Sequence, residues 1–334
     1  MTETPFWSRR DRIRPSARYT GTRKDQERPG VDHVRPRELV RVAGPGAVNT
    51  VNLQGVMGRG VALEFKRFFP EMFVEYRRLC EQHVLAIGKL HLYKTPHKWV
   101  LNFPTKTDWR KPSRVEHIEA GLKRVREVYL EAGIHSLAMP PIGCGNGQLD
   151  WRKQVGPLVH RHLDDLPIAV YVYPARASTS PPEHLDVERM REWLRSEPES
   201  LPFDEVWADV VALVGRSREF QTGSRGTRYS VTVNADPPVL HVETNGKKYT
   251  LEYDELLDFW QQLRQHGITF RSATPEHLRI SYLIPLFEQL PYVHRVEVSA
   301  SDEGLVKQPA AALQVVPPSR PPAQQGSLFR HRVG

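Results

Sequence analysis

Two glycine-rich loops constrain this chain more than any other feature of its sequence. Each loop follows an apolar, β-prone segment and precedes a helical pattern, the first within residues 47–69 and the second within residues 136–151. The glycines of the two loops are Gly55, Gly58, Gly60, Gly143, Gly145 and Gly147. Glycine reaches positive φ freely and lets a ligand touch the main chain, and N–H groups at a helix N-terminus attract phosphate. One such loop is equally consistent with a flexible turn, but two in one domain suit a diphosphate.

The spacing of the first loop excludes the dinucleotide-binding fingerprint. Residues 55–60 follow the pattern Gly-x-x-Gly-x-Gly, which reverses the fingerprint's spacing. No acidic residue follows at the distance expected for a contact with a ribose. The loop therefore predicts phosphate binding of another kind.

Helical and β-prone segments alternate from residue 47 onward. Helices are expected over residues 61–69, 71–81, 113–129 and 151–164, and strands over residues 89–93, 99–103, 137–139 and 168–173. Ser113 and Glu116 suggest a capping box for the third helix, and Asp150 is expected to cap the fourth. The alternation predicts an α/β domain whose mixed, mostly parallel sheet lies between helices, with ligands at the carboxyl ends of the strands.

The C-terminal half has a different pattern, typical of a smaller α+β domain. Helices are expected over residues 182–194, 203–214, 253–266 and 275–290, and strands over residues 229–234, 239–243, 248–251 and 293–299. Asn245 and Gly246 predict a tight turn within the strand meander. The predicted domain limits are a basic, poorly ordered segment 1–45, an α/β domain 46–176, a linker 177–182, an α+β domain 183–303 and a disordered tail 304–334.

Charge separates the two domains. Residues 46–182 contain 19 basic and 12 acidic residues, which gives a net charge of +7. Residues 183–303 contain 13 basic and 21 acidic residues, which gives a net charge of −8. A basic domain suits an anionic partner such as nucleic acid. The acidic domain and the lack of a recognised DNA-binding motif argue against a plain nucleic-acid-binding regulator.

Several classes of protein are disfavoured by composition. No apolar run approaches the length that crosses a membrane, and the Arg-rich N-terminus has no secretory pattern. Cys80 and Cys144 provide no disulfide framework, and the cysteines and histidines lack metal-ligand spacing. We therefore expect a cytoplasmic protein without metal or cofactor.

Four motifs in order resemble the macrodomain family. They are Val-Asn-Thr-Val-Asn (48–52), Gly-Val-Met-Gly-Arg-Gly (55–60), Asn-Phe-Pro-Thr-Lys-x-x-Trp-Arg (102–110) and Gly-Cys-Gly-x-Gly-x-Leu-Asp-Trp (143–151). Within that family the set is most similar to the DarG-type antitoxins, DNA ADP-ribosyl glycohydrolases that accompany DarT toxins. The resemblance covers residues 46–176 and implies a three-layer macrodomain sandwich.

The resemblance also implies a set of residues that bind ADP-ribose. They are Asn49, Asn52, Gly55, Val56, Met57, Gly58, Gly60, Thr105, Pro141, Gly143, Cys144, Gly145, Asn146 and Gly147. Asn49 and Asn52 are expected to meet the distal ribose, although either alone is also consistent with a turn or cap. A β-branched residue at position 145 should abolish binding, through lost φ freedom and close approach to the ligand.

Lys106 is the catalytic residue that the resemblance implies. Without the family resemblance, a lone lysine would be interpreted as a solvated charge. Lysine could attack the anomeric carbon of the opened ribose as an amine, or it could stay charged and stabilise the departing base. The sequence leaves both roles open.

Two departures from the family pattern affect this site. Related deglycosylating macrodomains carry an acid/base aspartate where this chain has Gly147, so the proton-transfer partner is unassigned. Residues 31–46 lack a convincing version of the turn whose aspartate binds adenine, and Asp32 is not assigned that role. Trp109 and Arg110 are candidates for stacking on a base and holding a phosphate of DNA, with packing as the alternative.

The resulting expectation is an antitoxin that removes ADP-ribose from thymidine of single-stranded DNA. Its acidic domain would block a DarT-like ADP-ribosyltransferase toxin by mimicking DNA at the toxin's DNA-binding surface. The alternatives are a non-catalytic ADP-ribose reader, favoured by Gly147 and opposed by Lys106, and a hydrolase acting on ADP-ribosylated protein.

Overall fold

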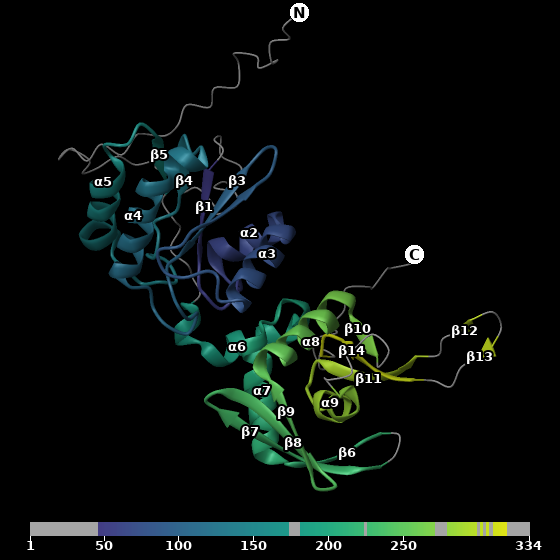
Figure 1. The fold of residues 1–334 in the computed structure, drawn as a ribbon. Helices are drawn as coiled ribbons and strands as arrows, with labels where there is room; N and C mark the ends of the chain where they lie inside the picture. Colours follow the sequence, from purple (N-terminus) through teal and green to yellow (C-terminus); the bar gives the residue numbers. More distant parts are fainter. Residues whose placement is uncertain are drawn as a thin grey trace, which may run out of the picture. The chain divides into compact units, whose positions relative to one another are not determined.

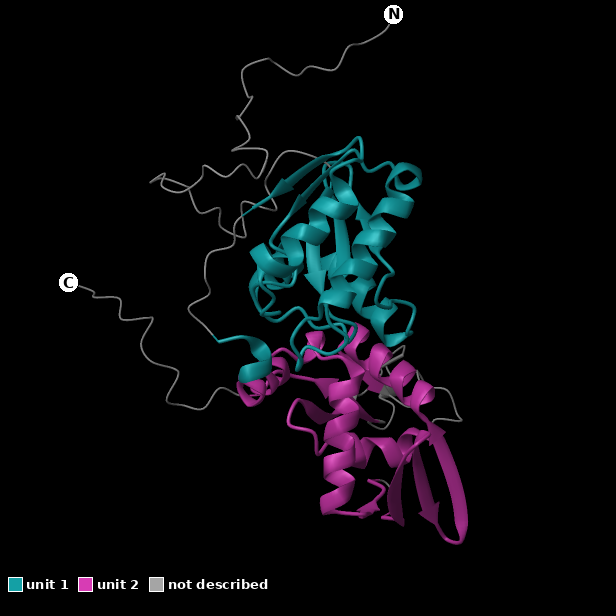
Figure 2. Ribbon diagram, turned by 90° about the vertical axis from the view of Figure 1, so that its left-hand side faces the viewer, with its two compact units in different colours: residues 1–185 teal, residues 186–334 magenta. Residues whose placement is uncertain are grey.

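The fold was examined in a computed structural model of the chain, drawn in Figure 1. The structure describes residues 46–173, 181–223, 226–270, 279–298, 301–302, 305–306 and 310–318. The chain divides into two compact units, residues 1–185 and 186–334, coloured separately in Figure 2. The segment 1–45 and most of the expected linker lie outside the described residues.

A five-stranded sheet forms the centre of the first unit. Its strands are β1 (Gly46–Val51), β2 (His91–Lys94), β3 (Trp99–Pro104), β4 (Ser136–Met139) and β5 (Ala169–Val172). They lie in the order β2-β3-β1-β4-β5, and only β2 runs antiparallel to its neighbour. The expected mixed, mostly parallel sheet is therefore confirmed.

Helices cover both faces of this sheet (Figure 1). One face packs on α2 (Gly60–Phe68) and α3 (Pro70–Glu81), and the other on α4 (Val115–Ala132), a π-helix (Trp151–Val155) and α5 (Gly156–Leu163). Successive strand residues point to opposite faces, so Ala47 joins the core with α2 and α3 while Val48 joins the core with α4 and α5. The result is a three-layer sandwich, as expected.

Gly121 sets how closely α4 approaches the sheet. A Cβ atom on this residue would lie 2.1 Å from Cζ of Phe103, a β3 residue that is 1% exposed. The absence of a side chain therefore lets the helix pack directly on β3, just before the carboxyl end of that strand.

The expected capping box at Ser113 is wrong. The residue before α4 is Arg114, which makes no side-chain cap, and the buried hydroxyl of Ser113 has no hydrogen-bond partner among the described residues. Ser113 instead donates its backbone N–H to the carbonyl oxygen of Gly147, so it ties the start of α4 to the second glycine loop. By contrast, Asp150 accepts from the backbone N–H of Lys153 at 2.9 Å and caps the π-helix as predicted.

The second unit contains three antiparallel sheets, one of them only two-stranded, and four longer helices among its described residues. The helices are α6 (Val187–Ser196), α7 (Phe203–Arg216), α8 (Tyr253–His266) and α9 (Ile280–Phe287), with a short 3₁₀ turn at Pro198–Ser200. Another 3₁₀ turn, Glu183–Leu185, lies at the end of the first unit. The four-stranded sheet consists of β6 (Glu219–Gln221), β7 (Arg228–Ala235), β8 (Pro238–Thr244) and β9 (Lys247–Glu252). The turn predicted at Asn245–Gly246 is confirmed, because both residues have positive φ.

The expected tail contains a strand. The second sheet has the order β10-β14-β11, built from β10 (Ile268–Phe270), β11 (Val293–Val298) and β14 (Ala310–Val315). Two further short strands, β12 (Ser301–Asp302) and β13 (Leu305–Val306), pair with each other. Ala312 and Leu313 of β14 are fully buried, so the prediction of a disordered tail from residue 304 is wrong for this segment.

Candidate active site

The functional residues expected in the first unit converge at the carboxyl edge of its sheet. The first glycine loop follows β1, Lys106 follows β3 and the second glycine loop follows β4. Because β1 pairs in parallel with both β3 and β4, the three segments leave the sheet side by side. This is the edge at which α/β sheets bind ligands.

Asn52 shapes the first loop from within. Its side-chain oxygen accepts from the N–H groups of Gln54 and Val56 at 2.9 and 3.3 Å, and its amide donates to the carbonyl of Val56 at 2.7 Å. The hydroxyl of Tyr76 in α3 donates to the Asn52 carbonyl at 2.8 Å. Asn52 therefore fixes the loop backbone, and its proposed contact with ribose stays a prediction.

Asn49 begins a polar network that crosses three strands and a helix, and runs from the buried sheet to the partly exposed Glu75. Its amide donates to the side-chain oxygen of Asn102, its register partner on β3, at 2.8 Å. Asn102 meets Nδ1 of His91 at 3.0 Å, and Nε2 of His91 meets Glu75 at 3.1 Å. The Asn49 side-chain oxygen is buried without a hydrogen-bond partner among the described residues. Asn102, His91 and Glu75 were not expected from the sequence to join Asn49.

The first loop ends in the N-terminus of α2, which is suited to an anion. Arg59 makes no side-chain cap there, and the first turn contains no acidic residue. The N–H groups at the start of a helix carry a partial positive charge, so this end of α2 is electrostatically suited to an anion.

The second loop combines a crowded glycine with an open one. A Cβ atom on Gly147 would lie 2.2 Å from both the carbonyl oxygen of Gly143 and the hydroxyl of Ser113, so no side chain fits. Gly145 has no heavy atom within 4 Å of a Cβ position and does not have positive φ. The expectation that Gly145 is needed for φ freedom is therefore wrong, whereas the open space above it is compatible with a ligand.

Gly60 places the two loops next to each other. A Cβ atom on this residue would lie 3.3 Å from the side-chain amide nitrogen of Asn146. The remaining expected loop residues lie in the same two segments, with Val56 and Met57 buried, Pro141 and Cys144 half-buried, and Gly58 beside them in the first loop. Burial, followed by the charge of Asp150, raises the pKa of the Cys144 thiol to about 12, which makes it a poor nucleophile.

Lys106 is buried between these loops. Its side chain is 6% exposed, and Nζ donates to the backbone carbonyl of Asn146 at 3.1 Å. The preceding residue, Thr105, anchors the segment, because its N–H donates to the carbonyl of Val51 at 2.9 Å. The ammonium is thus held against the second loop rather than in solvent.

A strap of residues 181–185 meets all three segments. The carboxylate of Glu183 lies 3.1 Å from Nζ of Lys106, Arg59 donates to the carbonyl of Pro181 at 2.8 Å, and Nε2 of His184 lies 2.9 Å from the side-chain oxygen of Gln148. Glu183 was expected in the C-terminal domain, and its contact with Lys106 was not predicted from the sequence. A general rule pointed to some partner, because a buried ammonium group needs a hydrogen-bond acceptor, but it did not identify Glu183.

Glu183 is itself buried, with 7% of its surface exposed. Burial raises the pKa of this carboxyl group, and the charges of Lys106 and Arg59 oppose that rise. Burial, and then the charge of Lys106, lowers the pKa of His184 in the same strap. Burial in the strap therefore disfavours the charged form of both side chains.

Trp109 does not offer a surface for base stacking. Its side chain is completely buried, and its ring N–H has no hydrogen-bond partner among the described residues, so the packing alternative is correct. Arg110 is partly exposed and paired with Asp108 at 2.9 Å, and its contact with DNA stays a prediction.

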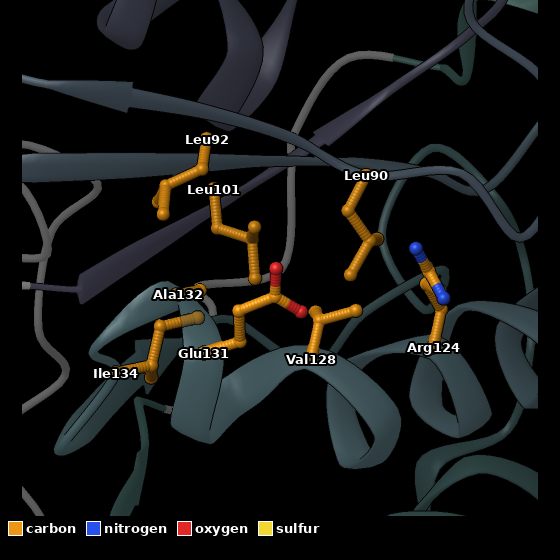
Figure 3. Close-up of a pocket in the computed structure, with 8 residues that line it drawn as sticks. All are labelled: Leu90, Leu92, Leu101, Arg124, Val128, Glu131, Ala132 and Ile134. Carbon is orange, nitrogen blue, oxygen red and sulfur yellow. The ribbon is translucent and has the colours of Figure 1, made fainter.

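A cavity of about 320 Å³ lies elsewhere in the first unit, between β2, β3 and α4 (Figure 3). Leucine, valine, alanine and isoleucine side chains form most of its wall, with Arg124 and Glu131 as the charged members. It contains no residue of the glycine loops and no nucleophile. We therefore place the candidate site at the carboxyl edge of the sheet and not in this cavity.

Within the described ranges, no cluster of three His, Cys, Asp or Glu side chains could hold a metal ion. Nor does any helix in the described part of the chain have the length and apolar character needed to cross a membrane.

Comparison with known proteins decides the family of the first unit. Residues 48–155 match the family model of the Macro domain. This region is a macrodomain. The matched range contains both glycine loops, Lys106 and the capping residue Asp150, while the strap lies beyond it.

Curated relatives of the macrodomain share an activity in their names. A DNA ADP-ribosyl glycohydrolase of Mycobacterium tuberculosis is 43% identical over 140 residues, which is 40% of this chain and 40% of that protein. A DNA ADP-ribosyl transferase–DNA ADP-ribosyl glycohydrolase fusion protein of Thermosipho africanus is 38% identical over 143 residues, 37% of each chain. The alignments thus span less than half the length of these relatives.

One of the similar solved structures is also a macrodomain. The macrodomain of Mycobacterium tuberculosis DarG is 41% identical, covering 41% of this chain and 93% of that chain, with a TM-score of 0.40.

Proposed function

We propose that the macrodomain binds ADP-ribose and removes it hydrolytically from ADP-ribosylated DNA. The observation that carries this proposal is the position of Lys106, buried between two glycine loops at the carboxyl edge of the sheet. The names of the relatives, which describe glycohydrolases acting on ADP-ribosylated DNA, support the same reaction.

The two loops suit the diphosphate of ADP-ribose. The uncapped N-terminus of α2 offers N–H groups from one side, and the open backbone around Gly145 offers a close approach from the other. An anion held by both would have positive potential on two sides. The distal ribose would then extend toward Lys106.

The reacting bond would be the N-glycosidic bond between the anomeric carbon of that ribose and a nucleobase, thymine in single-stranded DNA. The net charge of +7 over residues 46–182 favours a polyanionic substrate over most proteins. Arg110 is partly exposed in the segment that follows β3 and contains Lys106, and it is the proposed contact with a DNA phosphate.

Lys106→Ala tests the proposal. We expect release of ADP-ribose from modified single-stranded DNA to fall by at least about a hundredfold, while calorimetry shows binding of free ADP-ribose nearly unchanged. The reason is that the loops hold the diphosphate, whereas the lysine acts only in the reacting state. Lys123→Ala, which removes an exposed lysine from α4, is the matched control.

The outcomes separate the alternatives. Full activity of the alanine variant would reject Lys106 as the catalytic residue, and wild-type binding without any release would make the domain a reader. Release of ADP-ribose from modified protein but not from DNA would indicate a hydrolase that acts on ADP-ribosylated protein. Lys106→Arg distinguishes amine attack from electrostatic stabilisation, because guanidinium keeps the charge but forms no imine.

For the second unit we propose blockade of a DarT-like ADP-ribosyltransferase toxin. The fusion relative joins transferase and glycohydrolase in one name, and the net charge of −8 over residues 183–303 suits a basic, DNA-binding surface. The full chain with Lys106→Ala should therefore still protect cells from the toxin. Its affinity for the toxin should fall as salt rises, and an affinity independent of salt would reject mimicry of DNA.

A further inference from the structure

The strap supplies a carboxylate to a site that has no acid/base residue in its second glycine loop. Position 147 of that loop is glycine, and the Gly143 carbonyl and Ser113 leave no room for a side chain there. Among the described residues, Glu183 is the carboxylate recorded within hydrogen-bond distance of Nζ of Lys106, at 3.1 Å.

Both members of this pair are buried, which changes what the contact can do. The side chains of Lys106 and Glu183 are 6% and 10% exposed. Removing two charges from water is costly, and a proton passed from one to the other neutralises both without creating net charge. A buried ammonium–carboxylate pair is therefore well placed to become an amine and a carboxylic acid.

We propose that Glu183 is the positioning residue that accepts a proton from Lys106 and so supplies the free amine for attack on the ribose. This inference rests on the proposed function of Lys106. In the step, an Nζ–H bond breaks, its electron pair stays on nitrogen, and the proton bonds to the Glu183 carboxylate. Asn146 holds the nitrogen in place through its carbonyl. The amine then bonds to the anomeric carbon as the bond from that carbon to the nucleobase breaks, and the base leaves with a proton released from the attacking nitrogen. Water hydrolyses the resulting imine, which frees the ribose and regenerates the amine, and the proton returns from Glu183 to Nζ.

The surroundings of the pair favour this transfer. Burial raises the pKa of Glu183, so the carboxylate is a better proton acceptor than one in water. The other groups that interact with the pair electrostatically are Arg59, His184 and Tyr76. The pKa of His184 is lowered and that of Tyr76 is raised well above its usual value, so neither changes charge between about pH 7 and about pH 10.

The strap is held in place independently of Lys106. The Pro181 carbonyl accepts from the side chain of Arg59, the residue before α2, and His184 meets Gln148 beyond the second loop. Glu183 lies between these two anchors. The carboxylate is thus presented by a segment attached to both walls of the site and does not depend on its partner for position.

The test is Glu183→Gln in the full chain. Glutamine keeps the size of the side chain and can accept a hydrogen bond, but it is not a proton acceptor. At about pH 7 we expect release of ADP-ribose from modified DNA to fall by at least tenfold, with binding of free ADP-ribose within about twofold of wild type. The deficit should shrink toward pH 10, because hydroxide can then take the proton.

A second measurement does not need the DNA substrate. Free ADP-ribose opens to an aldehyde, so cyanoborohydride should trap its imine with Lys106 and increase the mass of the protein. The wild-type protein should be trapped at about pH 7, the glutamine variant weakly at that pH and strongly near pH 10, and Lys106→Arg at neither. Glu183→Asp keeps a carboxylate and should recover part of the rate.

Glu127→Gln is the matched control, since it removes an exposed carboxylate of α4 that pairs with Arg124. Wild-type rate in Glu183→Gln, equal loss of rate and ADP-ribose binding, or a deficit that does not change with pH would each overturn the proposal. So would failure of the wild-type protein to be trapped. Normal trapping behaviour without release from DNA would instead reject the proposed substrate and leave the role of Glu183 supported.

Discussion

At the scale of single residues, the site depends on positions where a side chain is absent. Gly147 lies against the backbone of Gly143, whereas Gly145 faces open space two residues earlier. The two residues look alike in the sequence but are glycine for different reasons. Gly147 has no space for a side chain within the loop, whereas the open space at Gly145 is proposed to receive a ligand.

This difference gives a prediction for two alanine variants. Gly147→Ala should lower the free energy of unfolding by about 2 kcal/mol or more, because its Cβ would overlap a backbone oxygen. Gly145→Ala should change stability by less than about 0.5 kcal/mol but weaken binding of ADP-ribose. Denaturant unfolding and calorimetry on both variants measure the two effects, and equal destabilisation would contradict the assignment.

The residue scale also shows what the sequence could and could not predict of the site. Lys106 and the glycine loops follow strands directly, so local pattern and family resemblance locate them. Glu183 meets Lys106 across 77 positions, and no local pattern links the two. Trp109 was a candidate for stacking on a base, with packing as the alternative, because neighbouring aromatic and basic residues suit DNA; that pattern does not distinguish stacking from burial in the core.

At the scale of elements, strands were predicted where β-branched and aromatic residues alternate, as in β3, β7 and β8. Strand β14 begins with three alanines, Ala310–Ala312, which have little intrinsic preference for strands. It forms because β10 and β11 each pair with one of its edges. Such a strand depends on tertiary contacts, and the local sequence therefore suggested a tail.

The central position of β14 predicts the effect of truncation. A chain that ends at residue 309 should lose the cooperative unfolding transition of the second unit, because β10 and β11 would lose their shared neighbour. A chain that ends at Pro318 retains β14 and should keep the transition. Thermal unfolding followed by circular dichroism compares the two, and identical curves would show that β14 contributes little.

At the scale of the whole molecule, the unit boundary lies nine residues after the predicted end of the first domain. The first unit extends to Leu185, whereas the sequence pattern ended the domain at residue 176. The difference matters because the intervening residues include Glu183, which contacts Lys106, the proposed catalytic residue.

Two fragments test this boundary. Fragment 46–176 should bind free ADP-ribose with an affinity within about threefold of fragment 46–185, since both contain the two loops. It should release ADP-ribose from modified DNA at least about tenfold more slowly, because it lacks the carboxylate. Calorimetry and a release assay on the same preparations give the comparison, and equal rates would show that the strap is dispensable.

The strap also imposes an order on biosynthesis. A ribosome makes β1, β3, β4 and both glycine loops before it makes Glu183, so a nascent macrodomain contains the lysine before its carboxylate. Until the strap emerges, the Lys106 ammonium lacks the partner that compensates its burial. We expect this corner of the nascent domain to stay open to water and close only after synthesis has passed the strap, so that hydrolytic competence arises last.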